Sequence, residues 1–124
     1  MEAMPHSHSF RDLKVWMRSM DLVEEIYSIS SRFPKDERFG LTSQIRRACV
    51  SVPSNIGEGS RRKRRNAFLH HLDIALGSQG EVEVQLEIAR RLRFVSEADY
   101  KRIQPAVEEI SKMLNGLIAS LQPD

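Results

Sequence analysis

The stretch Ser51-Val-Pro-Ser-Asn-Ile-Gly-Glu-Gly-Ser60 runs directly into Arg61-Arg-Lys-Arg-Arg65. These fifteen residues contain one proline, two glycines, one acid and then five consecutive cations. Apolar residues recur every three or four positions on both flanks, which indicates an amphipathic helix on each side. We therefore expect the stretch to turn the chain between two packed helices and to place five positive charges at the turn.

The rest of the chain also has helical periodicity, and it divides into four segments. Ser9-Phe-Arg-Asp12 has the form of a capping box that opens the first helix, and Phe33-Pro34 should stop that helix. The second helix is expected from about Leu41 to Ile56 and the third from about Arg64 to Arg93. A second capping box, Ser96-Glu-Ala-Asp99, opens the fourth helix.

Each predicted helix has one apolar stripe that should face a common core. The third stripe is a heptad seam with one polar position, Gln79. The predicted core positions are Leu13, Trp16, Met20, Val23 and Tyr27; Leu41, Ile45, Ala48, Val52 and Ile56; Phe68, Leu72, Ala75, Gln79, Val82, Leu86 and Ala89; and Ile103, Val107, Ile110, Leu114, Leu117 and Leu121.

Proline and glycine predict local irregularities within these helices. Pro53 should kink the second helix, because a proline in a helix interior costs about 3 kcal/mol. Gly57 and Gly59 should let the chain leave the helix through backbone angles that other residues resist. Gly77 and Gly80 lie inside the third helix, where we expect another backbone to approach closely.

These patterns predict an all-α fold, an up-down four-helix bundle over residues 10–122 that follows a flexible tail at residues 1–9. The chain has 124 residues and a single cysteine. Cys49 is therefore expected to be a small buried hydrophobe in a reducing cytoplasm. No apolar run approaches the roughly 20 residues of a membrane span, so we expect a cytoplasmic protein that does not contact a membrane.

The net charge of +2 hides an uneven distribution. The segment from residue 46 to residue 71 carries seven cations and one acid, a net +6, so the remainder carries −4. A polyanion would respond to this local field more than to the overall charge. The uneven distribution favours nucleic acid as a partner.

Several short motifs, taken together, resemble a known family. They are Phe10-Arg-Asp-Leu13 with Trp16, Leu41-Thr-Ser-Gln44, Arg46-Arg-Ala48, Ser51-Val-Pro-Ser-Asn55, Glu58-Gly-Ser60, and Ala75-Leu-Gly-Ser78 followed by Glu81. The chain is similar over nearly its whole length to the four-helix-bundle proteins first known from intervening sequences of bacterial 23S ribosomal RNA genes. The run Arg61 to Arg65 looks more basic than the usual family pattern.

The resemblance implies a four-helix bundle that assembles into a ring, a homopentamer in known relatives, with no established enzymatic chemistry. The same family includes the accessory variability determinant of diversity-generating retroelements, a basic pentameric barrel that binds nucleic acid and a reverse transcriptase. RNA or an RNA/DNA hybrid is therefore the ligand that the resemblance implies.

The predicted nucleic-acid-binding residues are the consecutive cations together with two arginines of the second helix. Phosphate contacts of this kind depend on salt, because each neutralised phosphate releases counterions. Few aromatic residues interleave with the cations, so recognition should be driven by the backbone, with weak sequence preference. The residues are Arg46, Arg47, Arg61, Arg62, Lys63, Arg64 and Arg65.

Glu58 and Glu81 are the one candidate pair of carboxylates for acid–base or metal chemistry. Di-metal bundles need a Glu-x-x-His spacing that His70 and His71 do not provide. The favoured interpretation is a buried polar network that fixes helix register. Its predicted members are Gln44, Asn55, Glu58, Ser78 and Glu81, with Arg47 as a charge partner.

The sequence therefore predicts a non-enzymatic, oligomeric nucleic-acid-binding protein with no cofactor and no metal. The alternative is an adaptor whose ring binds another protein, such as a reverse transcriptase, with the charges used for steering.

Overall fold

The computed structural model describes residues 10–123, so the predicted tail at residues 1–9 and the capping residue Ser9 lie outside the described part. Within it the chain is all-α, and no residue from 10 to 123 lies in a strand. The elements are the 3-10 turn η1 (Phe10–Asp12), helix α1 (Lys14–Ser30), the 3-10 turn η2 (Lys35–Glu37), and helices α2 (Leu41–Ser60), α3 (Arg65–Arg91) and α4 (Glu97–Leu121).

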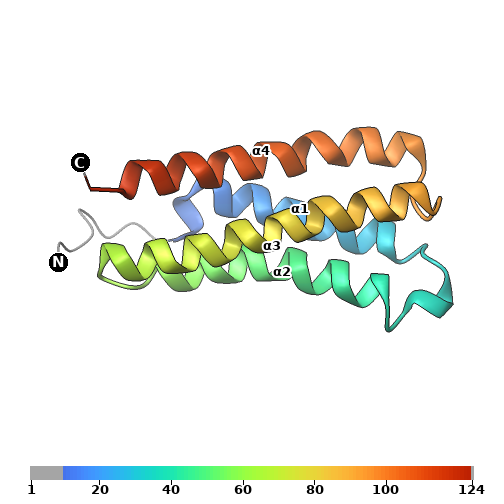
Figure 1. The fold of residues 1–124 in the computed structure, drawn as a ribbon, viewed down its shortest axis with the longest axis horizontal. Helices are drawn as coiled ribbons and strands as arrows, with labels where there is room; N and C mark the ends of the chain where they lie inside the picture. Colours follow the sequence, from blue (N-terminus) through green and yellow to red (C-terminus); the bar gives the residue numbers. More distant parts are fainter. Residues whose placement is uncertain (1–9, 124) are drawn as a thin grey trace.

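The four helices run up and down along one long axis (Figure 1). The α2–α3 turn, η1 and the end of α4 lie at one end of the bundle, and the α1–α2 and α3–α4 connections lie at the other. Helices α2 and α3 share the largest contact, followed by α3 with α4, α1 with α2, and α1 with α4. The predicted up-down bundle is confirmed within the described residues.

The core consists of apolar stripes from all four helices. All seven predicted positions of α3 are buried, including Gln79, whose Nε2 donates to the Val107 carbonyl at 3.1 Å. In α4 the first four predicted positions, Ile103 to Leu114, are buried, and Leu117 and Leu121 pack partly buried against them. Heptad spacing was therefore a reliable guide to these two helices.

Helix α1 differs from the prediction in which of its stripes faces the core. The buried stripe is Val15, Ser19, Leu22, Ile26 and Ile29. The predicted stripe is only half buried, and Met20 and Tyr27 are 37% and 41% exposed. Helix α1 is apolar on two adjacent faces, and periodicity alone does not say which one packs inward. The second stripe follows the edge of α1 that faces α2.

Helix α1 also begins and ends differently from the prediction. It starts at Lys14 after η1, and Leu13 at its N-cap makes no side-chain capping bond. It ends at Ser30, three residues before Phe33-Pro34. The capping box of α4 is confirmed, because the Asp99 backbone N–H donates to Ser96 Oγ at 3.1 Å.

Helix α2 continues through Pro53 and ends at Ser60, beyond the predicted end at Ile56. Gly57 and Gly59 therefore lie inside the helix, and no described glycine has a positive φ. The reason for Gly59 is packing. A Cβ there would lie 2.6 Å from Cβ of His71 and 2.9 Å from Cδ1 of Phe68.

The glycines of α3, unlike Gly59, have open space around them. A Cβ at Gly77 or Gly80 would meet no atom within 4 Å among the described residues. The predicted close approach of another backbone therefore does not occur within residues 10–123. Both glycines lie on an exposed face of α3.

Candidate nucleic-acid interface

The basic turn between α2 and α3 is short and well defined. Arg61 keeps helical backbone angles, and the Arg62 N–H donates to the Gly59 carbonyl at 3.1 Å. Arg64 is extended, with φ −119° and ψ 135°, and α3 starts at the next residue. We call residues 61–65 the basic turn. It places all five cations at one end of the bundle (Figure 1).

The side chains of the basic turn differ in their partners. Arg61 to Arg64 are exposed and Arg65 is half-buried. Arg62 pairs with Glu58 at 2.7 Å, and Arg65 also has a partner. Arg61, Lys63 and Arg64 make no hydrogen bond or ion pair with any residue in the range 10–123. No acid in the described part of the chain neutralises their charges.

Arg46 and Arg47 do not extend the basic turn. Along α2, Arg46 lies about 22 Å from Arg61, at 1.5 Å per residue. Its guanidinium sits 4.5 Å from the Tyr27 ring centroid, and its Nε donates to Ser30 Oγ at 2.8 Å. Arg46 therefore joins α2 to α1. Arg47 is exposed and lies at the edge of the groove between α2 and α3.

Cations at the opposite end of the bundle are of two kinds. Some pair with acids, and others make no ion pair with a described residue, namely Lys35, Arg38, Arg93 and Lys101. Arg90 contacts Glu97 at 3.1 Å, and Arg32 and Arg102 both bind Asp99, at 2.9 and 2.6 Å. The Arg102 guanidinium is the main reason that the pKa of Asp99 lies below its ordinary value. Acids are therefore interspersed with the cations of the opposite end, whereas the five consecutive cations of the basic turn have Glu58 as their neighbouring acid.

A polar network does join α2 to α3, with members that differ from the prediction. Ser51 and Ser78 share a hydrogen bond of 2.8 Å, and Asn55 Nδ2 donates to the Ser51 carbonyl at 2.9 Å. His71 Nδ1 lies 3.0 Å from Asn55 Oδ1. Sequence reasoning missed Ser51 and His71. The spacing of Gln44, Ser51 and Asn55 on one face of α2 is a signal that could have found Ser51.

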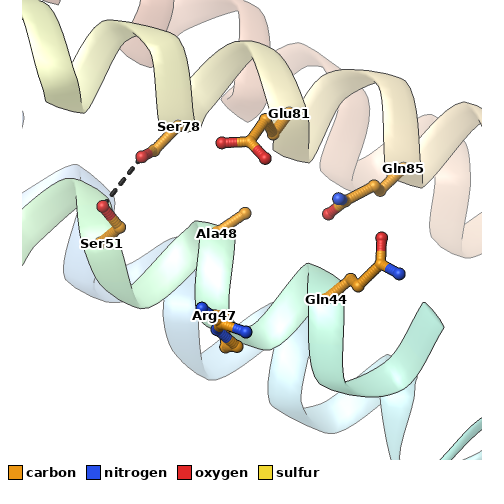
Figure 2. Close-up of a pocket in the computed structure, with 7 residues that line it drawn as sticks. All are labelled: Gln44, Arg47, Ala48, Ser51, Ser78, Glu81 and Gln85. Carbon is orange, nitrogen blue, oxygen red and sulfur yellow. Dashed lines mark hydrogen bonds between the residues drawn. The ribbon is translucent and has the colours of Figure 1, made fainter. Parts of the chain in front are cut away.

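The remaining predicted members, Gln44, Glu58 and Glu81, are exposed and take no part in this network. Figure 2 shows Gln44 and Gln85 pointing toward one another across a polar groove of about 440 Å³, with Glu81 directed into it. The Ser51–Ser78 bond closes one end of the groove. Gln85 Oε1 is buried and has no hydrogen-bond partner among the described residues.

Glu58 and Glu81 are not brought together. Glu58 lies beside the basic turn and is paired with Arg62, whereas Glu81 lies about ten residues away along the helix axes, beside Ala48. Among residues 10–123 no group of three or more His, Cys, Asp or Glu side chains is arranged to hold a metal ion. The paired-carboxylate arrangement therefore does not form.

Cys49 is buried on the core face of α2, as predicted, and is 1% exposed. Its Sγ donates to the Arg46 carbonyl at 3.4 Å. Burial raises the pKa of this thiol to about 12. A thiol with that pKa is a poor nucleophile at neutral pH.

The fold and the basic turn define a class of small up-down helical bundles that carry concentrated positive charge at one end. The chain belongs to the 23S rRNA-intervening sequence protein family, whose model matches residues 11–116.

A solved structure supports the same assignment. It is a crystal structure of a protein of unknown function from the S23 ribosomal protein family of Bacteroides thetaiotaomicron. The two are 27% identical with a TM-score of 0.78, and the match covers 85% of this chain and 95% of that one. None of the curated proteins matches the sequence. None of the helices in the described residues is long and apolar enough to cross a membrane.

Proposed function

We propose that this protein is a non-enzymatic, oligomeric nucleic-acid-binding protein that grips the phosphate backbone with the basic turn. RNA or an RNA/DNA hybrid is the proposed ligand, in line with a family described by its 23S rRNA intervening sequences. Phosphate contacts position a protein without reading bases. Sequence preference is therefore weak.

The observation that carries this proposal is the density of positive charge in the basic turn. Five consecutive cations lie there with Glu58 as their neighbouring acid, whereas Glu87, Glu97 and Asp99 lie among the cations of the other end. A phosphate that approaches the basic turn has few existing ion pairs to displace. The exposed ion pairs at the other end would compete with a phosphate for the same arginines.

Self-association multiplies these contacts. Ile74, Val84 and Ile88 are 40%, 59% and 40% exposed on α3. They share a second heptad-spaced face with Gly77 and Glu81. Exposed apolar faces of this kind mark contacts between proteins. A ring needs such a face to meet a different face on the next copy, and repetition turns weak contacts into avidity. The homopentamer of known relatives is the proposed form.

Replacing all five residues of the basic turn with Gln tests the binding. With about four phosphate contacts, affinity of the wild type for an RNA hairpin should fall about 100-fold between 50 and 200 mM salt. The variant should bind at least tenfold more weakly at 50 mM and should lose most of the salt dependence. Fluorescence anisotropy of a labelled hairpin gives both quantities.

A matched control removes five charges elsewhere. Gln substitutions at Lys35, Arg38, Arg93, Lys101 and Lys112 produce the same net charge but leave the basic turn intact. The control should keep its affinity within about twofold. Equal losses in the two variants would mean that binding follows overall charge, and the proposal would be wrong.

Oligomeric state is tested separately with Val84→Lys, which places a charge in the exposed heptad face of α3. Sedimentation should show a multimer for the wild type and a monomer for the variant. A monomeric wild type would contradict the assembly.

The rival function, an adaptor for a protein such as a reverse transcriptase, is favoured if the wild type forms a ring but binds no RNA.

A further inference from the structure

An apolar pocket of about 400 Å³ opens between α1 and α2 directly beside the basic turn. Its volume lies in the range of about 300–1,000 Å³ that small-molecule sites occupy. The second apolar stripe of α1 supplies Trp16, Met20 and Val23, and α2 supplies Pro53 and Gly57. Arg61 stands at the rim. No sequence pattern joins Trp16 to Arg61, because 45 positions separate them.

A contact between two aromatic rings fixes one wall of this pocket. The Phe10 and Trp16 rings meet edge to face, with centroids 5.0 Å apart. Gly57 keeps the neighbouring wall open, because a Cβ there would lie 3.7 Å from the Phe10 ring and 3.9 Å from Trp16 Nε1. Trp16 is half-buried, yet its indole N–H donates to no residue in the described part of the chain. A half-buried indole usually has a partner.

The charge at the rim selects the kind of ligand. Among the described residues Glu58 is the one acid that lines the pocket, and it is already paired with Arg62 at 2.7 Å. Arg61 has no acid partner within residues 10–123, and Lys63 and Arg64 follow in the same turn. An apolar, aromatic interior with a cationic rim complements a flat ring attached to an anion. A nucleobase on its phosphate has this form.

We propose that the pocket receives one unpaired base of a bound nucleic acid, packed against Trp16, while Arg61 contacts the adjacent phosphate. This inference rests on the proposed function and refines it, because it makes loops and bulges better ligands than a continuous duplex. Bases in such places are free to leave the stack and pack on aromatic side chains. Base–aromatic stacking contributes about 1–3 kcal/mol per base, or roughly five- to 150-fold in affinity.

Trp16 is the sole tryptophan of the chain, so intrinsic fluorescence reports directly on the pocket. Two RNAs with equal numbers of phosphates should be titrated at low salt, a hairpin with a ten-nucleotide loop and a blunt duplex. The hairpin should quench Trp16 and bind about tenfold more tightly than the duplex. The duplex should bind through the basic turn with little change in fluorescence.

Two glycine variants separate the pocket from general effects. Gly57→Leu fills the pocket, and the hairpin-to-duplex affinity ratio should fall from about ten toward one. Gly116→Leu is the matched control, because a Cβ at Gly116 on α4 meets nothing within 4 Å. It should keep the wild-type ratio. The wild-type fluorescence titration decides the question without any variant if Gly57→Leu fails to fold.

The outcomes distinguish this inference from the proposed function. Equal affinity for both RNAs with unchanged Trp16 emission would overturn the base pocket and leave phosphate binding intact. Emission that changes on protein dilution, and not with RNA, would assign the pocket to a second copy of the chain. Failure of both RNAs to bind would remove the proposed function and this inference together.

Discussion

Helix α2 has a groove on each side, and the two grooves have opposite chemistry. Toward α3 the groove is polar, and Ser51, Asn55, Ser78 and His71 satisfy one another across it. Toward α1 the groove is apolar, and its aromatic wall lines an open pocket. The comparison shows that one groove mainly fixes how the helices fit together, and the other leaves a surface open beside the basic turn.

Gly57 and Gly59 lie two residues apart on α2, and substitutions there test the difference between its two sides most directly. Gly59→Ala would place a Cβ 2.6 Å from Cβ of His71 and should destabilise the protein by about 2–3 kcal/mol, because helix α3 must shift. Thermal and urea denaturation measure the change. A loss below about 0.5 kcal/mol would mean that the α2–α3 contact is loose.

Removing the bond across the polar groove should have the next largest effect. Ser78→Ala removes the 2.8 Å hydrogen bond to Ser51 Oγ, which keeps the Asn55 Nδ2 donor at 3.1 Å, and should cost about 1 kcal/mol. A double-mutant cycle with Ser51→Ala, followed by urea denaturation, should give a coupling energy of about 0.5–1 kcal/mol. Val50→Thr, on the exposed side of α2, is the control and should change stability by less than about 0.5 kcal/mol.

Gly57→Ala should act in the opposite direction to Gly59→Ala. Its Cβ would make ordinary contacts at 3.7–3.9 Å, and alanine is better than glycine in a helix by about 0.8–1.0 kcal/mol. The free energy of unfolding should therefore rise by about 0.5–1 kcal/mol. Destabilisation instead would show that α2 packs as closely against Phe10 and Trp16 at Gly57 as it does against α3 at Gly59.

Cys49 lies on the core face of α2, between the grooves, and should make the free energy of unfolding depend weakly on pH. The Cys49 thiol has its pKa raised to about 12 by burial, so the folded state keeps this proton at pH values where the unfolded chain loses it. Stability from this group is complete below about pH 8.5 and declines as pH rises toward 12. At pH 9.5, about one unit above the ordinary thiol pKa, the decline should be on the order of 1 kcal/mol.

Urea denaturation of wild type and Cys49→Ala at pH 7.5 and 9.5 isolates this contribution, because all other titrating groups are shared. The wild type should lose more stability over that interval than the variant. Identical losses would show that the thiol ionises equally in both states.

Much of the fold was predictable from the sequence, and the parts that were not have specific causes. Helix α3 was predictable because one heptad stripe carries nearly all of its buried residues, from Phe68 to Ala89. Helix α1 was not, because Val15 and Trp16 begin two apolar stripes of similar strength. The close approach expected at Gly77 occurs instead at Gly59, because sequence does not say which helix face meets a neighbour.

The candidate site also has features that the sequence predicted and features that it did not. The basic turn follows from five consecutive cations after a helix, so its charge and exposure were visible in the sequence. Its separation from Arg46 was not, because Arg46 has Tyr27 and Ser30 as partners across the α1–α2 contact. The position of Trp16 beside Arg61 was also hidden, since it depends on α1 and α2 running antiparallel.

By itself, the sequence determined four amphipathic helices, an all-α bundle and a basic turn, because periodicity and local charge are properties of neighbouring residues. The tertiary structure alone decided which stripe of α1 faces the core, which serines meet across α2 and α3, and which cations pair with an acid. Those features depend on contacts between residues far apart in the chain, whose geometry is set only when the helices pack.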